Sequence, residues 1–352
     1  MTFSDVIKSY MKRILVTGGT GYIGSHTVVE LQNACYEPVI VDNLCKSSAV
    51  IIDRIAKITG KHPTFEQVDC CDYDGLNKVL QKYEGIQAIV HFAAFKAVGE
   101  SCAKPLDYYQ NNLVSLINLL RLMPIHNVKG IVFSSSCTVY GQPEVVPVNE
   151  QSPILPANCP YGNTKQISEE IIRDTIASGC PIKSILLRYF NPIGAHPTSL
   201  IGELSNGIPL NLVPYITQTA MGIREQLSVF GDDYNTCDGS CIRDYIDVVD
   251  LAKAHVLAIG RMLDKNTEQV EVFNLGTGNG VSVLELVKGF EDATGVKLNY
   301  KIVGRRPGDV EQVYANCQKA NEFLGWEATT PLKETLLNAW KWQQKLRVDE
   351  IM

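Results

Sequence analysis

The chain has 352 residues, 45% of them hydrophobic, and a formal net charge of -6. This apolar content excludes wholesale disorder, and the length suits one large two-lobed domain. No basic patch stands out, which argues against a nucleic-acid partner. The longest apolar runs, such as Ala88–Ala94, suit buried strands and are too short to cross a membrane. Met1–Lys12 lacks the apolar core of a signal peptide and is expected to be a short extension.

The eleven cysteines are spread along the chain without the spacing of a disulfide framework. No export signal accompanies them, so reduced thiols in the cytoplasm are the expected state. Cys70 and Cys71 are adjacent, and Cys237 and Cys241 lie four apart, but no matching Cys or His pair follows either. No metal site is therefore expected.

In chain order, the first half alternates short, apolar, β-branched runs with longer helical patterns. Strands are predicted at Arg13–Thr17, Glu37–Asp42, Thr64–Asp69, Ala88–Phe92, Gly130–Ser134 and Ser184–Arg188. The helices predicted between them are Ser25–Asn33, Val50–Ile58, Tyr73–Gln81, Leu106–Met123 and Tyr161–Ser178. This alternation predicts an α/β fold, a doubly wound parallel sheet of the Rossmann type.

After Phe190 the character of the sequence changes. Asn191–Pro214 is rich in Pro, Gly and Asn and predicts long loops, which are usually functional in a compact domain. A helix at Tyr245–Ile259 and a strand at Val272–Leu275 are predicted to return to the sheet. We therefore expect an NAD-binding domain over residues 11–190 and a smaller interleaved lobe over residues 191–352. The lobe should cover the carboxyl edge of the sheet, where ligands bind in such folds.

A glycine-rich turn follows the first predicted strand. Gly18, Gly21 and Gly24 stand three apart, so the backbone can turn tightly and approach a pyrophosphate. The third glycine permits close packing of helix on strand, and the helix N-terminus adds free N–H groups. The alternative is a plain structural loop.

Two carboxylates come at the ends of the next two predicted strands. Asp42 is placed to accept hydrogen bonds from the adenosine ribose and to repel a 2′-phosphate, which predicts NAD and not NADP. Asp69 is placed to meet the adenine edge. For both, the alternative is a turn-forming residue at a strand end.

A catalytic group is predicted farther along. Tyr161 and Lys165 stand four apart on one face of a helix, and Ser136 ends the fifth predicted strand. The free pKa of tyrosine is about 10, and a nearby ammonium and a cationic nicotinamide would both lower it. Ser136 would hold the reacting hydroxyl near Tyr161. The three residues predict hydride transfer with tyrosine as acid and base; the alternative is a surface pair beside a strand-end turn.

With these motifs in place, the chain from about Met11 to Trp342 resembles the extended short-chain dehydrogenase/reductases and, among them, the UDP-galactose 4-epimerases. The most telling stretches are Val41–Leu44, His91–Ser101, Leu187–Pro192, Arg243–Ile246 and Asn274–Gly278. The resemblance implies an NAD-dependent enzyme that interconverts UDP-glucose and UDP-galactose at C4 through a 4-keto sugar. It also implies a cytoplasmic homodimer that acts in galactose metabolism.

The resemblance further assigns roles to residues. Tyr161 would be the proton acceptor, Lys165 its electrostatic partner and Ser136 the residue that positions the hydroxyl. Besides these three, the cofactor set would comprise Gly18, Gly21, Tyr22, Ile23, Gly24, Asp42, Asn43, Asp69, Cys70, Phe92, Ala93, Lys96, Asn111 and Phe190. The UDP-sugar set would comprise Asn191, Asn211, Leu212, Phe230, Arg243, Tyr245, Arg306, Asp309 and Val313.

Three residues of the UDP-sugar set carry a separate physical argument. The guanidinium groups of Arg243 and Arg306 suit a diphosphate, because each can donate paired hydrogen bonds. The alternatives are a surface pair of Arg243 with Asp244 and a solvated charge at Arg306. Val313 falls where bacterial relatives often have a tyrosine beside the sugar C2, so N-acetylated UDP-sugars are expected to fit. Here the alternative is that Tyr314 fills the space.

Three other functions compete with epimerisation. A nucleotide-sugar 4,6-dehydratase on the same fold would place an Asp-Glu pair directly after the fifth strand, where this chain has Cys137–Val139. A reductase would need an exchangeable cofactor, usually NADP, which Asp42 disfavours. A non-catalytic NAD-sensing protein has no need of Ser136, Tyr161 and Lys165 together.

Overall fold

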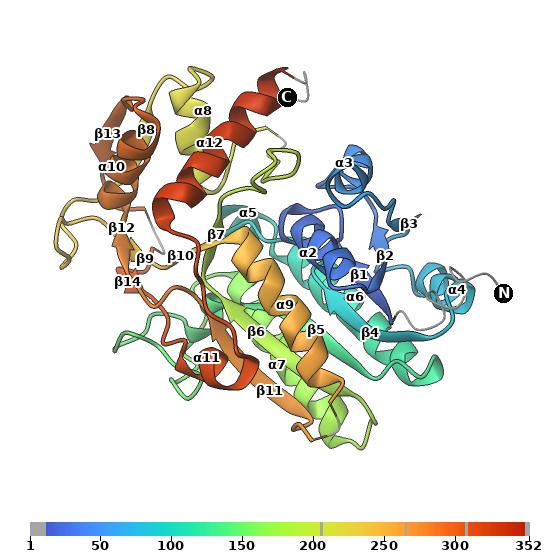
Figure 1. Cartoon of the computed structure of the whole chain (residues 1–352). Coiled ribbons are helices and arrows are strands. Elements are labelled where there is room, and N and C mark those ends of the chain that lie inside the picture. The colour runs from blue at the N-terminus through green and yellow to red at the C-terminus, as the bar shows by residue number, and fades with distance from the viewer. Residues whose placement is uncertain (1–11, 205–206, 265, 307–308, 349–352) are drawn as a thin grey trace.

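The computed structural model describes residues 12–204, 207–264, 266–306 and 309–348, so the predicted N-terminal extension lies outside the described part. Its main sheet has seven strands in the order β11-β6-β5-β4-β1-β2-β3 (Figure 1). Every neighbouring pair in this sheet is parallel, which confirms the predicted doubly wound sheet. The strands are β1 (Arg13–Thr17), β2 (Glu37–Asp42), β3 (Thr64–Gln67), β4 (Ile86–His91), β5 (Gly130–Ser136), β6 (Lys183–Tyr189) and β11 (Val270–Leu275).

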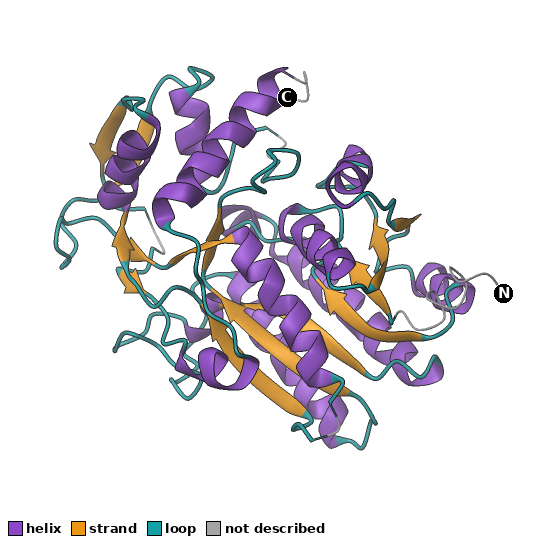
Figure 2. Cartoon of the chain, in the orientation of Figure 1, coloured by secondary structure: helices purple, strands orange, loops and turns teal. Residues whose placement is uncertain are grey.

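The strands are apolar on both faces because helices cover both (Figure 2). In β1, Ile14 and Val16 face one core layer and Leu15 faces the other, since successive side chains alternate. One layer receives α2 (Tyr22–Asn33), α3 (Val50–Thr59) and α9 (Val248–Met262); the other receives α4 (Tyr73–Lys82), α6 (Pro105–Ile125) and α7 (Pro160–Ala177). Among the described residues, no helix is both long enough and apolar enough to cross a membrane.

A smaller lobe lies beyond the carboxyl edge of the sheet (Figure 1). It contains α8 (Leu212–Ala220), α10 (Val283–Thr294), α12 (Leu332–Val348) and the parallel pair of β8 (Leu227–Phe230) and β13 (Tyr300–Val303), around a core of its own. Short sheets join the lobe to the main body: β7 (Asn191–Ile193) with β10 (Tyr245–Asp247), and β9 (Ile242–Arg243) between β12 (Val281–Ser282) and β14 (Gln312–Val313). The remaining elements are α5 (Val98–Ala103), the 3₁₀ turn η1 (Cys137–Tyr140) and α11 (Gln318–Leu324).

Several predicted boundaries are wrong, and three of them concern segments near the lobe or the site. The helix predicted from Tyr245 begins at Val248, because Asp247 caps it by accepting a hydrogen bond from the Val249 N–H at 2.8 Å, and the preceding residues pair with β7. The third strand ends at Gln67 and not at Asp69. The long loop predicted at residues 191–214 contains β7 and the first turn of α8.

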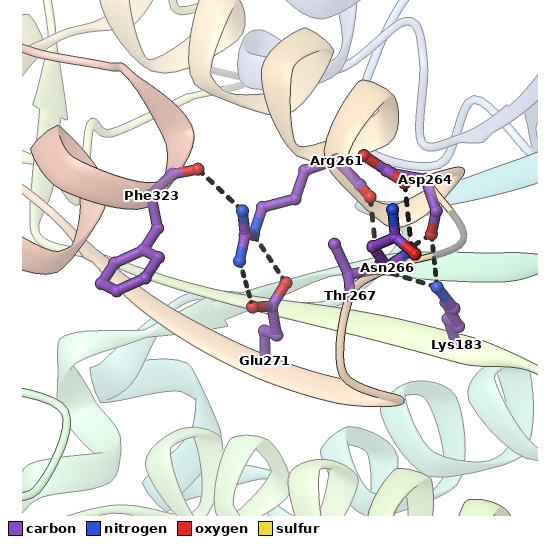
Figure 3. Close-up of polar contacts among 7 residues, drawn as sticks. All are labelled: Lys183, Arg261, Asp264, Asn266, Thr267, Glu271 and Phe323. Carbon is purple, nitrogen blue, oxygen red and sulfur yellow. Dashed lines mark hydrogen bonds and ion pairs between the residues drawn. The ribbon is translucent and has the colours of Figure 1, made fainter.

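Arg261, in the last turn of α9, fixes the segment that returns from the lobe to the sheet (Figure 3). Its guanidinium donates to both carboxylate oxygens of Glu271 in β11, at 2.7 and 2.6 Å, and to the Phe323 carbonyl at 2.9 Å. Nearby, Lys183 of β6 donates to the Thr267 hydroxyl at 2.8 Å. These contacts tie α9, β11 and α11 together at the edge of the sheet remote from the lobe.

Arg261→Leu should lower the free energy of unfolding by about 2–3 kcal/mol, because it leaves the buried Glu271 carboxylate without its partner. The change is measured from urea unfolding followed by circular dichroism. The matched control is Arg305→Leu, since Arg305 pairs with Asp233 where both side chains are exposed; this variant should unfold like the wild type. Equal behaviour of the two variants would refute the assigned role of Arg261.

Candidate active site

The glycine-rich turn brings an open helix end to the carboxyl edge of β1. Gly18 has φ of +70°, and a Cβ there would lie 2.8 Å from the backbone nitrogen of Ala93. A Cβ on Gly24 would lie 2.2 Å from the Gly18 carbonyl oxygen, so α2 can approach β1 only without a side chain there. Gly21 is the N-cap of α2, and neither a side-chain cap nor an acidic residue occupies its first turn. The backbone N–H groups in the first turn of α2 are thus available to bind an anion.

Tyr22 and Ile23 open α2 directly after this turn. The hydroxyl of Tyr22 donates to the Gly194 carbonyl oxygen at 2.7 Å, which links α2 to the loop after β7. Ile23 is partly buried and packs against the core layer beneath α2. The two residues therefore lie at the boundary between the sheet domain and the lobe.

Asp42, at the end of β2, is buried and tied to the glycine turn. One oxygen accepts from the Thr20 N–H at 3.2 Å, and the other accepts from the Leu44 N–H at 2.9 Å and from the Ser47 hydroxyl at 3.1 Å. These bonds fix the orientation of the carboxylate, and its two oxygens have lone pairs for further donors.

Asn43, Asp69 and Cys70 lie beside Asp42, where β2 and β3 end. The amide of Asn43 donates to an Asp69 oxygen at 2.8 Å, although Asp69 lies two residues beyond the end of β3. Cys70 is buried in the core layer below. The structure therefore brings the four predicted residues of this group together.

The loop after β4 carries Phe92, Ala93 and Lys96 and is held by Asn112, which sequence reasoning missed. The Asn112 side chain accepts from the Phe95 N–H at 2.8 Å and donates to the Phe95 carbonyl at 3.0 Å. It also donates to the Thr164 hydroxyl of α7 at 3.1 Å. The available signal was its spacing, because Asn112 stands four residues after Tyr108 and four before Leu116 on the buried face of α6.

The remaining residues of this loop have other partners. Asn111, the predicted neighbour of Asn112, donates to the Asn112 side-chain oxygen at 2.9 Å. Phe92 stacks near His255, with ring centres 4.8 Å apart. Lys96 points to the lobe, where its ammonium donates to Glu203.

Ser136, Tyr161 and Lys165 meet at the carboxyl end of β5. Ser136 is the last residue of the strand, and Tyr161 is the second residue of α7, within hydrogen-bond reach of Ser136. The Lys165 ammonium lies 5.8 Å from the Tyr161 ring centre and donates to the Ser134 carbonyl at 2.6 Å. Pro160 starts α7, a position that suits proline because it needs no N–H there.

Burial moves the pKa values of the two ionisable groups in opposite directions. It raises the pKa of Tyr161 well above its usual range, against a hydrogen bond with Ser136 that lowers it. It lowers the pKa of Lys165 to about 7, against the attraction of Glu169 that raises it. The predicted lowering of the tyrosine pKa includes the charge of a bound nicotinamide and stays a prediction. Desolvation dominates, and Lys165 carries only part of a positive charge at neutral pH.

This shift predicts a pH dependence of stability. Between pH 7 and the free lysine pKa of about 10.4, the unfolded chain binds a proton at Lys165 that the folded chain does not, so stability rises with pH. In nucleotide-free protein, the stability of the wild type relative to Lys165→Met should rise from pH 7 to pH 9, with a limiting slope of about 1.4 kcal/mol per pH unit. Urea unfolding of both proteins in matched buffers measures it, and a flat or falling difference would contradict the burial argument.

The predicted UDP-sugar residues from the lobe form a second cluster. Arg306 donates to Asp309 at 2.6 Å, and Arg243 lies 3.9 Å from the same carboxylate oxygen. The Arg306 guanidinium also lies over the ring of Phe230, 5.6 Å from its centre. Two cations and an exposed aromatic ring are thus gathered at one carboxylate.

Asp244, which sequence reasoning passed over, makes this cluster possible. The alternative in which it pairs with Arg243 does not hold, because its carboxylate accepts from the Thr277 N–H at 2.8 Å, the Gly278 N–H at 3.1 Å and the Ala315 N–H at 3.1 Å. It is fully buried and joins β11 and β14 to the start of β10. Arg243 is thereby left for Asp309.

The other predicted residues are Phe190 of the cofactor set and Asn191, Tyr245, Asn211 and Leu212 of the UDP-sugar set. Phe190 is buried at the end of β6, and its N–H donates to the Leu275 carbonyl at 3.2 Å. Asn191 and Tyr245 are paired in the β7–β10 ladder. Asn211 is the N-cap of α8, directly before Leu212, and its amide donates to Glu203 and not to the arginine cluster.

Val313 is paired with Arg243 in the β9–β14 ladder. Its buried side chain belongs to an apolar cluster with Val139 and Phe190. The ring of Tyr314 lies against Gly280, where an added Cβ would come within 3.1 Å of it. The alternative in which Tyr314 fills the space beside Val313 is therefore disfavoured.

In the part of the chain that the structure describes, no three His, Cys, Asp or Glu side chains are grouped so that they could hold a metal ion.

Comparisons with known proteins agree with this geometry. A family model described as GDP-mannose 4,6 dehydratase matches residues 15–338. A UDP-glucose 4-epimerase of Bacillus subtilis (strain 168) is 52% identical over 330 residues, which are 94% of this chain and 96% of that protein.

Two solved structures are similar over nearly their whole length. UDP-glucose 4-epimerase from Bifidobacterium longum, in complex with NAD+ and UDP, has a TM-score of 0.91 and 46% identity and covers 95% of this chain and 98% of its own. UDP-glucose 4-epimerase from Stenotrophomonas maltophila, with bound NAD and formylated UDP-arabinopyranose, has a TM-score of 0.93 and 46% identity. The match covers 97% of this chain and 100% of that chain. With its sheet topology, its glycine turn and these likenesses, the chain belongs to the UDP-glucose 4-epimerase family.

Proposed function

We propose that this protein is an NAD-dependent epimerase that interconverts UDP-glucose and UDP-galactose at C4. The observation that carries the proposal is the meeting of Ser136, Tyr161 and Lys165 at the carboxyl end of β5, on the same sheet edge as the open N-terminus of α2. An acid/base group and an anion-binding helix end at one edge are what hydride transfer to a dinucleotide requires.

The residues present fit NAD. Gly18 packs on the backbone of Ala93 and Gly24 on the Gly18 carbonyl oxygen, which fixes the uncapped first turn of α2 at the sheet edge. Asp42 presents a carboxylate that would accept ribose hydroxyls and repel a 2′-phosphate. When bound there, NAD would take a hydride from the sugar C4 and return it. Asn43, Asp69 and Cys70 would hold the adenosine, and Phe92, Ala93, Lys96, Asn111 and Phe190 would surround the rest.

The lobe would hold the UDP-sugar through its nucleotide. Arg243 and Arg306 can donate paired hydrogen bonds to the diphosphate, and the exposed ring of Phe230 offers a face to the base. Asn191, Asn211, Leu212, Tyr245 and Asp309 complete the set. Because these contacts are remote from the reacting carbon, the sugar ring could rotate to present its other face while the nucleotide stays bound.

Proton transfer would fall to Tyr161. Its phenolate oxygen would take the proton of the sugar 4-hydroxyl, and the resulting hydroxyl would give it back after the sugar has turned, while Ser136 holds the sugar hydroxyl by a hydrogen bond. Since burial raises the pKa of Tyr161, the phenolate needs positive charge beside it, which Lys165 supplies when it is protonated.

A 4,6-dehydratase is the alternative that the name of the matching family model suggests. It would need a carboxyl group near the sugar C6, directly after β5. That segment is the 3₁₀ turn η1, which reads Cys137–Tyr140 and contains no carboxylate. Relatives named UDP-glucose 4-epimerase also support epimerisation over dehydration.

We also propose how the chain is organised and where the protein is located. We assign NAD binding to residues 11–190 and UDP-sugar binding to residues 191–352, with the 245–275 segment built into the sheet domain; the core of the lobe supports this division. A cytoplasmic location is supported by the eleven cysteines, all free in the structure. A homodimer is proposed from the family resemblance.

Tyr161→Phe should lower turnover of UDP-galactose at least about 100-fold, the lower limit for loss of a general acid/base, while the protein still binds NAD. Turnover is measured without added cofactor, and the nucleotide released on denaturation, NAD and not NADP, is identified by mass spectrometry.

Tyr83→Phe is the matched control, since it removes a hydroxyl that donates to Glu66 at the other end of the sheet; it should turn over like the wild type. Near-normal activity of Tyr161→Phe would overturn the assignment of the acid/base.

We further propose that the enzyme accepts UDP-GlcNAc and UDP-GalNAc. Val313 is small for the wall position beside the sugar C2, and the ring of Tyr314 lies against Gly280. Space for an N-acetyl group would therefore remain beside Val313.

Val313→Tyr should lower activity on the acetylated pair about 100-fold or more, by steric exclusion, and change activity on UDP-glucose and UDP-galactose less than about threefold. The test compares kcat/KM for the four UDP-sugars in wild type and variant. Rejection of the acetylated sugars by the wild type would make Val313 a packing residue only.

A further inference from the structure

One carboxylate oxygen connects a residue of the proposed cofactor set with a residue of the proposed substrate set. Oε1 of Glu203 accepts a hydrogen bond from the Lys96 ammonium at 2.9 Å and another from the Asn211 amide at 2.5 Å. Lys96 follows β4 in the sheet domain, and Asn211 precedes α8 in the lobe. The Glu203 side chain is only 12% exposed and the Lys96 side chain 57%, so the lysine reaches from the surface to a fixed acceptor.

Glu203 is held in place by its backbone, independently of these two donors. The indole N–H of Trp342 in α12 donates to the Glu203 carbonyl at 3.0 Å. The preceding residue, Gly202, forms a bridge with Ala195, and a Cβ on Gly202 would lie 2.6 Å from the Trp342 ring. The position of the carboxylate is therefore set by the packing of this loop on α12.

Both donors are side chains that Glu203 helps to orient; the Lys96 ammonium also lies 5.9 Å from the centre of the Tyr22 ring. Lysine is among the side chains that lose most rotamer entropy on being fixed, and the ion pair limits the range of the Lys96 ammonium before any ligand binds. Asn211 is the N-cap of α8 but makes no capping hydrogen bond, because its amide is turned to Glu203. The first turn of α8 stays open as a result.

We propose that Glu203 is a positioning residue, which presets Lys96 for the cofactor and Asn211 for the UDP-sugar and thereby couples the binding of the two ligands. The inference rests on the proposed function, since it takes Lys96 and Asn211 as ligand-binding residues. An ion pair that only stabilises the fold would affect unfolding and leave ligand affinities unchanged.

The first test compares Glu203→Ala and Glu203→Gln in NAD-loaded protein, with UDP as the probe. The alanine variant should raise the Kd of UDP, measured by isothermal titration calorimetry, and the KM for UDP-galactose about 5-fold, the effect of one lost hydrogen bond, while kcat changes less than about threefold. Glutamine keeps an acceptor for Asn211 but not the charge that holds Lys96, so its Kd for UDP should lie between those of the wild type and the alanine variant. An unchanged Kd in the alanine variant would overturn the proposal.

The second test is a double-mutant cycle between Glu203→Gln and Lys96→Met, again with the Kd of UDP as readout. If Lys96 acts on the UDP site through Glu203, Lys96→Met should weaken UDP binding in the wild type and have less than about half that effect in the Glu203→Gln background. Equal effects in both backgrounds, or none in the wild type, would refute the coupling. This cycle decides the question even if the alanine variant does not fold.

Glu291→Ala is the matched control. Glu291 is 15% exposed, pairs with Lys297 at 2.6 Å and accepts from the Leu298 N–H, so it resembles Glu203 in burial and charge. Its loss should leave the Kd of UDP unchanged, and a rise equal to that of Glu203→Ala would show that the effect is not specific. Failure of the wild type to epimerise UDP-galactose would refute the proposed function instead, because the Kd of UDP does not depend on turnover.

Discussion

The contact between Gly24 and the Gly18 carbonyl oxygen is the constraint on which the site depends. An added Cβ on Gly24 would lie 2.2 Å from that oxygen, so α2 rests on the turn only because no side chain separates them. The open end of α2 is thereby fixed just beyond β1, where the strand order reverses between β1 and β4. The neighbouring strands then deliver Asp42 and the loop that carries Lys96 to the same edge.

A second constraint is electrostatic, because burial favours the neutral forms of the two ionisable groups in the candidate active site. Burial disfavours both the phenolate of Tyr161 and the ammonium of Lys165. The Lys165 ammonium lies 5.8 Å from the Tyr161 ring centre, so under the proposed function each charge would favour the other. Under the proposed function, a cationic ring beside Tyr161 would favour the phenolate further. Acid/base strength would then depend on the redox state of the cofactor.

Local sequence patterns predicted the strands of the main sheet and those site residues that lie at the end of a strand. The apolar runs that end at Thr17, Asp42 and Ser136 placed those residues at the carboxyl edge, because parallel strands buried on both faces leave little choice. Tyr245–Asp247 was misassigned since its pairing with β7 depends on residues far away in the chain. Asn112, Glu203 and Asp244 were missed for the same reason: each acts through partners that only the folded chain brings near.

The position of β11 has a consequence for how the chain can be made. β11 completes the main sheet by pairing with β6, yet about 80 residues separate the two strands in the sequence, and the lobe is built mostly from residues on either side of β11. During synthesis, β6 would have one unpaired edge until residue 275 has left the ribosome, and such edges invite pairing with other chains. A fragment that stops at residue 190 would keep that edge permanently. The sheet domain and the lobe therefore have to be synthesised together in order to fold. Expression of either part alone should give aggregates more than folded protein.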